Sequence, residues 1–264
     1  MQVLQQDAQK QIVRSERNAW LPSTGTVLSS PYDRIAAWYD EGIRRGGSLH
    51  DLVLPGLVEL CGNLQGTEIC DLACGQGVLA RRLAEHGAKV LGVDLSQELL
   101  KIAQREERIQ PLGIRYLHGD AQHLHGLPDA AFDGVVCNLA LMDIANLSAV
   151  ACTVQRILRP GGWLVFAIVH PCAPVSSAQG TLLHAFHDYF DEGFWCSNNL
   201  SSVRGRVGAH HRTLSTYLTS FLTVGLVLER VMEPQATGSF AASIEGYDRV
   251  PVVFIAQWRK GSTR

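Results

Sequence analysis

From residue 67 onward, short apolar runs alternate with longer segments in which apolar residues recur at helical spacing. The apolar runs predict strands at 67–71, 89–93, 113–117, 134–137 and 163–169. The segments between them predict helices at 78–86, 96–107 and 147–158, the last ended by the turn at 159–162. Strands that are continuous in apolar character are typical of sheets buried on both faces. The pattern therefore predicts an open parallel sheet with right-handed crossovers.

The C-terminal part of the chain has a different pattern. Residues 213–224 predict an amphipathic helix, and 226–232 and 250–258 predict strands. Residues 233–249 are rich in Pro, Gly, Ser and Ala, so we expect no helix between these two strands. The last two strands are therefore predicted to form an antiparallel hairpin at the edge of the sheet. The fold class is α/β, with a Rossmann-like, mostly parallel sheet of seven strands.

Two segments lie outside the predicted sheet. Residues 1–62 contain predicted helices at 32–45 and 49–60 and form an N-terminal helical cap or lid. Residues 171–212 form an insertion after the fifth strand that is rich in aromatic residues and histidine. We find no repeat and no linker, so 1–264 is predicted to be one domain: a cap (1–62), a cofactor-binding core (63–170), a lid over the substrate (171–212) and a C-terminal helix and hairpin (213–264).

Composition narrows the possible partners. The formal charge of −2 gives no general attraction to nucleic acid or to anionic membranes. No apolar run is long enough to span a bilayer, and residues 1–18 lack the apolar core of a signal peptide, so the chain is predicted to be cytoplasmic. The seven cysteines form no C-x-x-C pair, and we expect no metal.

The segment 68–77, EICDLACGQG, is an apolar strand that runs into an acid, a turn of small residues and two glycines, with a helix after it. The glycines permit a tight turn and a close approach of the backbone to a ligand. Residues 75–80 also satisfy the dinucleotide fingerprint G-x-G-x-x-A, and Asp94 is a plausible acid for a ribose. This elbow by itself leaves two cofactors open.

Four consecutive predicted strands end in an acid or an amide: Asp71, Asp94, Asp120 and Asn138. Ligands of open α/β sheets bind outside the carboxyl ends of the strands. Together with the elbow, the run 90–96 and the turn at 158–162, this pattern resembles the class I S-adenosylmethionine-dependent methyltransferases that act on small molecules. The cofactor of that family carries a diol, an amine, an ammonium and a sulfonium, which acceptor groups suit. A dinucleotide needs its pyrophosphate held, and the elbow contains no basic residue.

The resemblance implies roles for particular residues. In the first motif, Asp71 faces the amino group of the methionine part, and Ala73, Gly75 and Gly77 let the backbone pass beside the cofactor. In the other motifs, the resemblance implies contacts to the ribose, the adenine and the methionine part from Asp94, Leu95, Asp120, Ala121, Asn138 and Leu139. It also implies that Tyr32 and Tyr39 lie in a lid helix over the cofactor. A structural reading stays open for several of these residues, because Asp94 is also suited to cap the helix after it and the tyrosines to pack.

Methyl transfer to a hydroxyl, an amine or an acidic carbon needs a base, and neutral histidine is the usual one near pH 7. His170 is the first candidate because it follows the fifth strand on the ligand side. Its structural alternative is a histidine that only orders the insertion. His210 and His211, at the end of the insertion, are further candidates. Asp143 is a candidate to steer an amine, with capping of the following helix as its structural alternative.

The function predicted is S-adenosylmethionine-dependent methylation, at O, N or C, of a small aromatic or apolar metabolite. A nicotinamide-dependent oxidoreductase is the first alternative. A non-catalytic adenosylmethionine-binding or assembly protein is the second. The expected partner is a small-molecule acceptor, without nucleic acid or membrane, and the N-terminal helices are a possible surface for a homo-oligomer.

Overall fold

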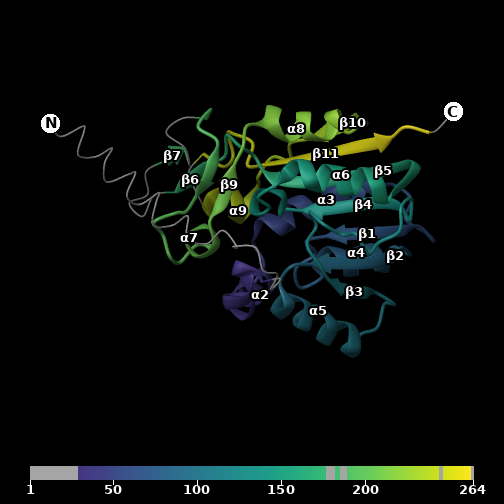
Figure 1. The fold of residues 1–264 in the computed structure, drawn as a ribbon. Helices are drawn as coiled ribbons and strands as arrows, with labels where there is room; N and C mark the ends of the chain where they lie inside the picture. Colours follow the sequence, from purple (N-terminus) through teal and green to yellow (C-terminus); the bar gives the residue numbers. More distant parts are fainter. Residues whose placement is uncertain (1–28, 177–181, 185–188, 244–245, 263–264) are drawn as a thin grey trace.

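The computed structural model describes residues 29–176, 182–184, 189–243 and 246–262. Its centre is a seven-stranded sheet with the order β10-β11-β5-β4-β1-β2-β3 (Figure 1). Strands β1 to β5 pair in parallel, whereas β11 is antiparallel to both β5 and β10. The predicted mostly parallel sheet with an antiparallel terminal pair is confirmed. The strands are β1 Glu68–Leu72, β2 Lys89–Asp94, β3 Arg115–His118, β4 Phe132–Asn138, β5 Leu158–Val169, β10 Leu226–Met232 and β11 Val253–Lys260.

Helices cover both faces of this sheet. Helices α3 (Leu49–Cys61) and α4 (Val78–Glu85) bury their apolar residues against one face. Helices α6 (Leu147–Ile157) and α8 (Leu214–Thr223) do so against the other face, while α5 (Gln97–Ile109) lies beside β3. Successive strand residues alternate between the two cores, as Ile69 and Cys70 do in β1. This alternation explains why the strands are continuously apolar.

Two expectations about element boundaries are wrong. The predicted helix 32–45 is a 3₁₀ turn, η2 (Pro31–Arg34), followed by α2 (Ala36–Arg44). Ile35 between them has φ −122° and ψ 5°, so the chain leaves the helical conformation there. The predicted turn 159–162 lies inside β5, where the pairing with β4 shifts its register. The two glycines lie in a β-bulge, so the strand continues through them instead of ending there.

A third expectation is also wrong, because a short helix, α9 (Gly238–Ser243), lies between β10 and β11. The composition of residues 233–249 argued against a helix there. In the fold, Phe240 and Ala241 of α9 pack against the core on the α3 side of the sheet. Tertiary packing therefore overrides local propensity in this connection.

The insertion forms its own small elements outside the main sheet. Strands β6 (Pro174–Ser176) and β7 (Leu182–His184) pair with each other, as do β8 (Gly193–Trp195) and β9 (Ala209–His211). Helix α7 (Val203–Val207) lies between β8 and β9. Figure 1 shows these elements gathered with α2 at one end of the sheet. The cap and the insertion are thus brought together, although they are far apart in the sequence.

Candidate functional site

Two hydrogen bonds join the elbow between β1 and α4 to the end of β2. The backbone N–H of Cys74 donates to the carbonyl of Val93 at 3.0 Å, and that of Gly75 donates to Asp94 Oδ2 at 2.7 Å. Ala73 and Gly75 adopt φ of 54° and 56°. Such a conformation is uncommon for alanine and places strain at this turn. The backbone is therefore held in one shape beside the ends of the two strands.

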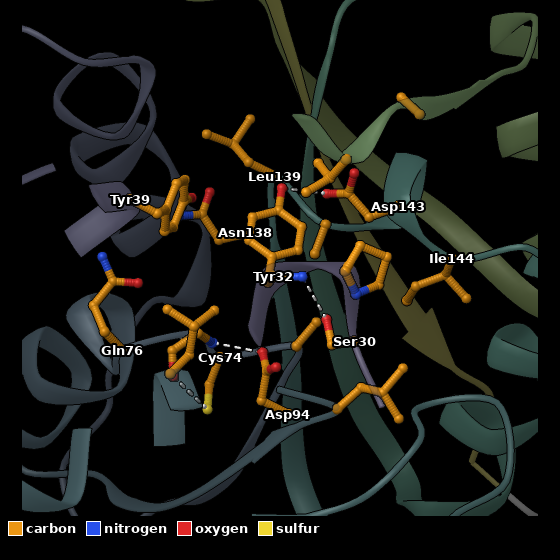
Figure 2. A pocket seen from close by; sticks show the side chains of 18 of the residues that line it. Ser30, Tyr32, Tyr39, Cys74, Gln76, Asp94, Asn138, Leu139, Asp143 and Ile144 are labelled. Carbon is orange, nitrogen blue, oxygen red and sulfur yellow. Dashed lines mark hydrogen bonds between the residues drawn. The ribbon is translucent and has the colours of Figure 1, made fainter. Parts of the chain in front are cut away.

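This elbow borders a cavity of about 140 Å³. Figure 2 shows Tyr32 near its centre, between Asp94 and the side chains of Asn138 and Asp143. Ile144 and Leu99 add apolar surface to the wall. The residues that sequence reasoning selected and that line this cavity are Tyr32, Tyr39, Asp71, Ala73, Gly75, Asp94, Leu95, Asn138, Leu139 and Asp143.

Several polar atoms at this cavity are buried without a hydrogen-bond partner among the described residues. They are both carboxylate oxygens of Asp71, Oδ1 of Asn138 and Nε2 of Gln76. Burial raises the pKa of Asp71 well above its usual range, and the nearby charge of Asp94 raises it further. Orphaned buried acceptors are costly unless a ligand supplies donors. No lysine or arginine is among the described residues of the cavity wall, so these residues fit a ligand with an ammonium and hydroxyl donors better than one with a pyrophosphate.

Asp94 has both roles that the sequence left open. Its Oδ1 accepts the N–H of Ser96 at 2.6 Å and its Oδ2 accepts that of Gly75, so it orders the turn into α5. Its carboxylate also lines the cavity. Burial raises the pKa of Asp94, although the two backbone donors oppose the shift. Each carboxylate oxygen keeps a second lone pair for a ligand.

Three of the residues expected at the cofactor do not line this cavity. Gly77 has φ 85°, and a side chain there would meet the Tyr116 hydroxyl at 2.4 Å, so packing requires this glycine. The Asp120 carboxylate accepts the backbone and side-chain N–H groups of Gln122 at 2.9 and 3.0 Å. Ala121 is buried in the core on the α6 side.

A buried network joins the cap, the core and the insertion at this site. The Tyr32 hydroxyl donates to Asp143 Oδ2 at 3.2 Å, and Arg204 of α7 pairs with the other oxygen of Asp143. Burial raises the pKa of Asp143, and Arg204 opposes that shift. Asp143, on the 3₁₀ turn η3 (Leu141–Asp143), is thus a paired carboxylate rather than a free base.

A second cavity, of about 440 Å³, adjoins the first one. Its wall comes mainly from the insertion, the start of α3 and the end of β5. Five residues border both cavities and form the boundary between them. They are Tyr32, Tyr39, His50, Leu139 and Ala209.

His50 is the histidine on this boundary. Its Nε2 lies 3.1 Å from the Tyr39 hydroxyl, and its Nδ1 lies 3.3 Å from Asn138 Nδ2. Burial lowers the pKa of His50, so the ring is neutral at pH 7. Sequence reasoning missed His50, because a histidine in the first turn of a cap helix carries no signal that it reaches the end of β4. It also missed Gln76, which stands in the elbow between the two glycines.

His170 and His211 line the second cavity rather than the first. Nδ1 of His170 accepts the Cys172 N–H at 3.0 Å, and its Nε2 lies 3.1 Å from Glu233. Burial lowers the pKa of His170, and Glu233 opposes that shift. Nε2 of His211 donates to the Tyr189 carbonyl at 2.8 Å. The described geometry therefore gives His170 two occupied ring nitrogens, and its role as a base stays a prediction.

Within the described ranges, no group of three His, Cys, Asp or Glu side chains is arranged to hold a metal ion. None of the helices described there is both long and apolar enough to pass through a membrane.

Comparisons with known proteins agree with this site. Residues 70–166 match the family described as a methyltransferase domain. The chain is similar to an S-adenosylmethionine-dependent methyltransferase structure from Mesorhizobium loti (30% identity over 78% of this chain and 96% of that one, TM-score 0.63). A second such structure, from Listeria monocytogenes, is 28% identical over 78% of this chain and 97% of that one, with a TM-score of 0.65.

Among curated relatives, a ubiquinone biosynthesis O-methyltransferase of Alkalilimnicola ehrlichii is 27% identical over 56% of this chain and 64% of its own length. A ubiquinone biosynthesis O-methyltransferase of Bordetella avium is 28% identical over 51% of this chain and 57% of its own length. The chain thus spans about six tenths of the length of these relatives.

Proposed function

The chain belongs to the class I S-adenosylmethionine-dependent methyltransferases, and we propose that it methylates a small, apolar or aromatic metabolite. The family assignment decides between the two cofactors that the elbow alone left open. The observation that carries the proposal is the pair of adjoining cavities, one walled by orphaned acceptors and the other by aromatic side chains and histidines. Small-molecule sites are concave and mostly apolar with few polar groups, as the second cavity is.

Within the first cavity, the chain's own residues fit the cofactor that the family uses. We propose that Asp71 accepts from its ammonium, Asp94 from its ribose hydroxyls, and that Leu95 and Ile144 lie against its adenine. When bound, the cofactor supplies an electrophilic methyl group. Asp120 does not line this cavity, and Gln122 already donates to both of its carboxylate oxygens, so we propose a smaller contribution from it.

The names of the relatives suggest the kind of acceptor. They include ubiquinone biosynthesis O-methyltransferases and a demethylmenaquinone methyltransferase of Tropheryma whipplei, 34% identical over 40% of this chain and 44% of its own length. We propose a quinone-like or other aromatic acceptor in the second cavity. Positioning of acceptor and methyl donor does much of the work in such a displacement.

For proton removal, two histidines are candidates. We propose His170 as a residue that contacts the acceptor and acts as the base only if it releases Cys172 or Glu233. His50 is the second candidate, because it borders both cavities and is neutral at pH 7. His170→Gln and His50→Gln separate the two: the variant of the base loses the pH dependence of methyl transfer, whereas the other variant keeps it.

Calorimetry with adenosylhomocysteine tests the cofactor part of the proposal, and methyl transfer from labelled adenosylmethionine to aromatic acceptors tests the activity. Binding together with labelled product supports the proposal. Binding without turnover on any acceptor supports the non-catalytic alternative, and no binding overturns both. A homo-oligomer through the N-terminal helices also stays a proposal, which sedimentation measurements test.

A further inference from the structure

The second cavity has an unbalanced positive charge in its wall. Among its lining residues are Arg204 and Arg212, and no aspartate or glutamate lines it in the part of the insertion that the structure describes. Arg204 is neutralised by Asp143. His170 is paired with Glu233, which does not itself border the cavity. Arg212 has no such carboxylate among the described residues.

Arg212 is a buried guanidinium, 8% exposed, that lies at the end of β9. It donates to the carbonyls of Leu141, Ile144 and Ala145 at 3.0, 2.6 and 2.7 Å. Arg212 also contacts Tyr217, through a hydrogen bond to the hydroxyl and with its guanidinium carbon 5.9 Å from the ring centroid. These neutral groups orient the guanidinium but do not cancel its charge, and a buried cation without a counter-charge is costly.

His210 borders the same cavity, and no hydrogen bond to its ring is found among the described residues. Its ring lies edge-on to Phe194, with the centroids 5.2 Å apart. Burial lowers the pKa of His210 to about 4, and the charge of Arg212 contributes to the shift. At pH 7 the ring is therefore neutral and has one N–H donor and one lone pair for a ligand.

We infer that the second cavity binds an apolar acceptor that carries one negative charge, held by Arg212 and His210. The inference rests on the proposed function, since it takes this cavity as the acceptor site. A carboxylate or phenolate balances the charge of Arg212 and receives charge-assisted bonds, which are stronger than neutral ones. The aromatic and aliphatic wall, with Trp195, Tyr217 and Met142, contacts the remainder of the ligand.

Two isosteric probes test this inference on the full chain saturated with adenosylhomocysteine. Hydroxynaphthoate carries the anion, and hydroxynaphthamide of the same substitution is its neutral counterpart. A charge-assisted hydrogen bond is worth about 1.5–3 kcal/mol, so calorimetry should show the acid binding about tenfold or more tightly than the amide. Equal affinity of the two probes overturns the inference, as does failure of the acid to bind while adenosylhomocysteine binds.

A matched pair of variants at His210 sharpens the test without disturbing the carbonyl bonds of Arg212. His210→Glu places an acid beside the guanidinium, so we expect the preference for hydroxynaphthoate to disappear while the amide still binds. His210→Gln has the same size without the charge and should keep most of the preference. An unchanged preference in His210→Glu contradicts the inference. Binding of adenosylhomocysteine by both variants reports the fold, and its failure in the wild-type chain overturns the proposed function and this inference with it.

Discussion

The two adjoining cavities differ in which parts of the chain build them and in their charge. The first has its acceptors at the ends of β1, β2 and β4, namely Asp71, Asp94 and Asn138, while the cap and the insertion close it from the other side. The second is walled largely by the cap and the insertion, and its charged groups are cationic. If the proposed function holds, the acceptors of the sheet bind a cationic cofactor, and the cap and insertion bind an acceptor of opposite charge. The two sites then share the boundary formed by Tyr32, Tyr39, His50, Leu139 and Ala209.

The largest expected effect comes from the ion pair between the cavities. Arg204→Met leaves Asp143, whose side chain is only 19% exposed, without its counter-charge; removing one partner of a fully buried pair costs about 3–5 kcal/mol, which is the upper bound for this partly buried one. We expect urea unfolding to show a loss of up to that size. The double variant Asp143→Leu with Arg204→Met should recover most of the loss, because no buried charge remains.

Arg206→Met on the same short helix is the control. Arg206 is exposed and its guanidinium lies 4.3 Å from the ring centroid of Trp38. An exposed cation–π contact is worth about 0.5–1 kcal/mol, so this variant should lose little stability. If Arg206→Met were as damaging as Arg204→Met, the buried pair would not be what holds α7 to the core.

A second prediction concerns Asp94, whose two functions both depend on its carboxylate. Asp94→Ala removes a charge-assisted acceptor worth about 1.5–3 kcal/mol, so adenosylhomocysteine should bind about tenfold to a hundredfold more weakly in calorimetry. It also leaves the N–H groups of Gly75 and Ser96 without their acceptor, at a cost of about 1–3 kcal/mol in unfolding free energy.

Asp120→Ala provides the comparison at another strand end. Asp120 bonds to Gln122 and does not line the first cavity, so we expect a smaller loss of cofactor affinity. Equal losses in the two variants would show that position at a strand end, rather than contact with the cavity, decides the effect.

A third prediction uses Asp71, whose buried oxygens have no hydrogen bond of normal length and whose raised pKa is opposed only by the Ala80 N–H. Asp71→Asn should weaken adenosylhomocysteine binding about tenfold, since an amide replaces the acceptor that can be charged when the ligand binds. The same change should stabilise the unliganded protein near pH 7, because the buried carboxyl no longer has to hold a proton above its usual pKa or be charged.

The raised pKa of Asp71 determines how the stability difference between the wild-type chain and Asp71→Asn changes with pH. The pKa of Asp71 is raised in the folded state, so the folded chain keeps a proton that the unfolded chain loses above about pH 4. Wild-type stability therefore falls relative to Asp71→Asn as the pH rises from about 4 through the raised pKa. Urea unfolding of both proteins at pH 4 and pH 8 measures the difference. A constant difference would show that Asp71 is not the source of the penalty.

The difference between the sheet ends and the segments added to the sheet explains which site residues could be predicted from the sequence. Asp71, Asp94 and Asn138 were found because strand ends follow from the apolar pattern, and parallel strands bring their carboxyl ends to one edge. His50 was missed as a site residue because its place depends on how the cap folds over that edge. For Gly77, the φ of 85° and the nearby Tyr116 hydroxyl account for the glycine, and its contact with the cofactor stays a prediction. Helix α9 was missed because its stability comes from packing rather than from its composition.

The smallest expected effect tests whether the boundary between the cavities separates their functions. Tyr39→Phe removes the hydroxyl that lies 3.1 Å from His50 Nε2, at a cost of about 0.5–1.5 kcal/mol in unfolding free energy. The ring keeps its edge-to-face contact with Tyr32, at 5.3 Å between centroids, so the wall of the first cavity stays in place. We therefore expect nearly unchanged affinity for adenosylhomocysteine and a change only in acceptor binding or turnover. A loss of cofactor affinity as large as that of Asp94→Ala would mean that Tyr39 belongs to the cofactor site alone, and that the boundary lies deeper in the second cavity.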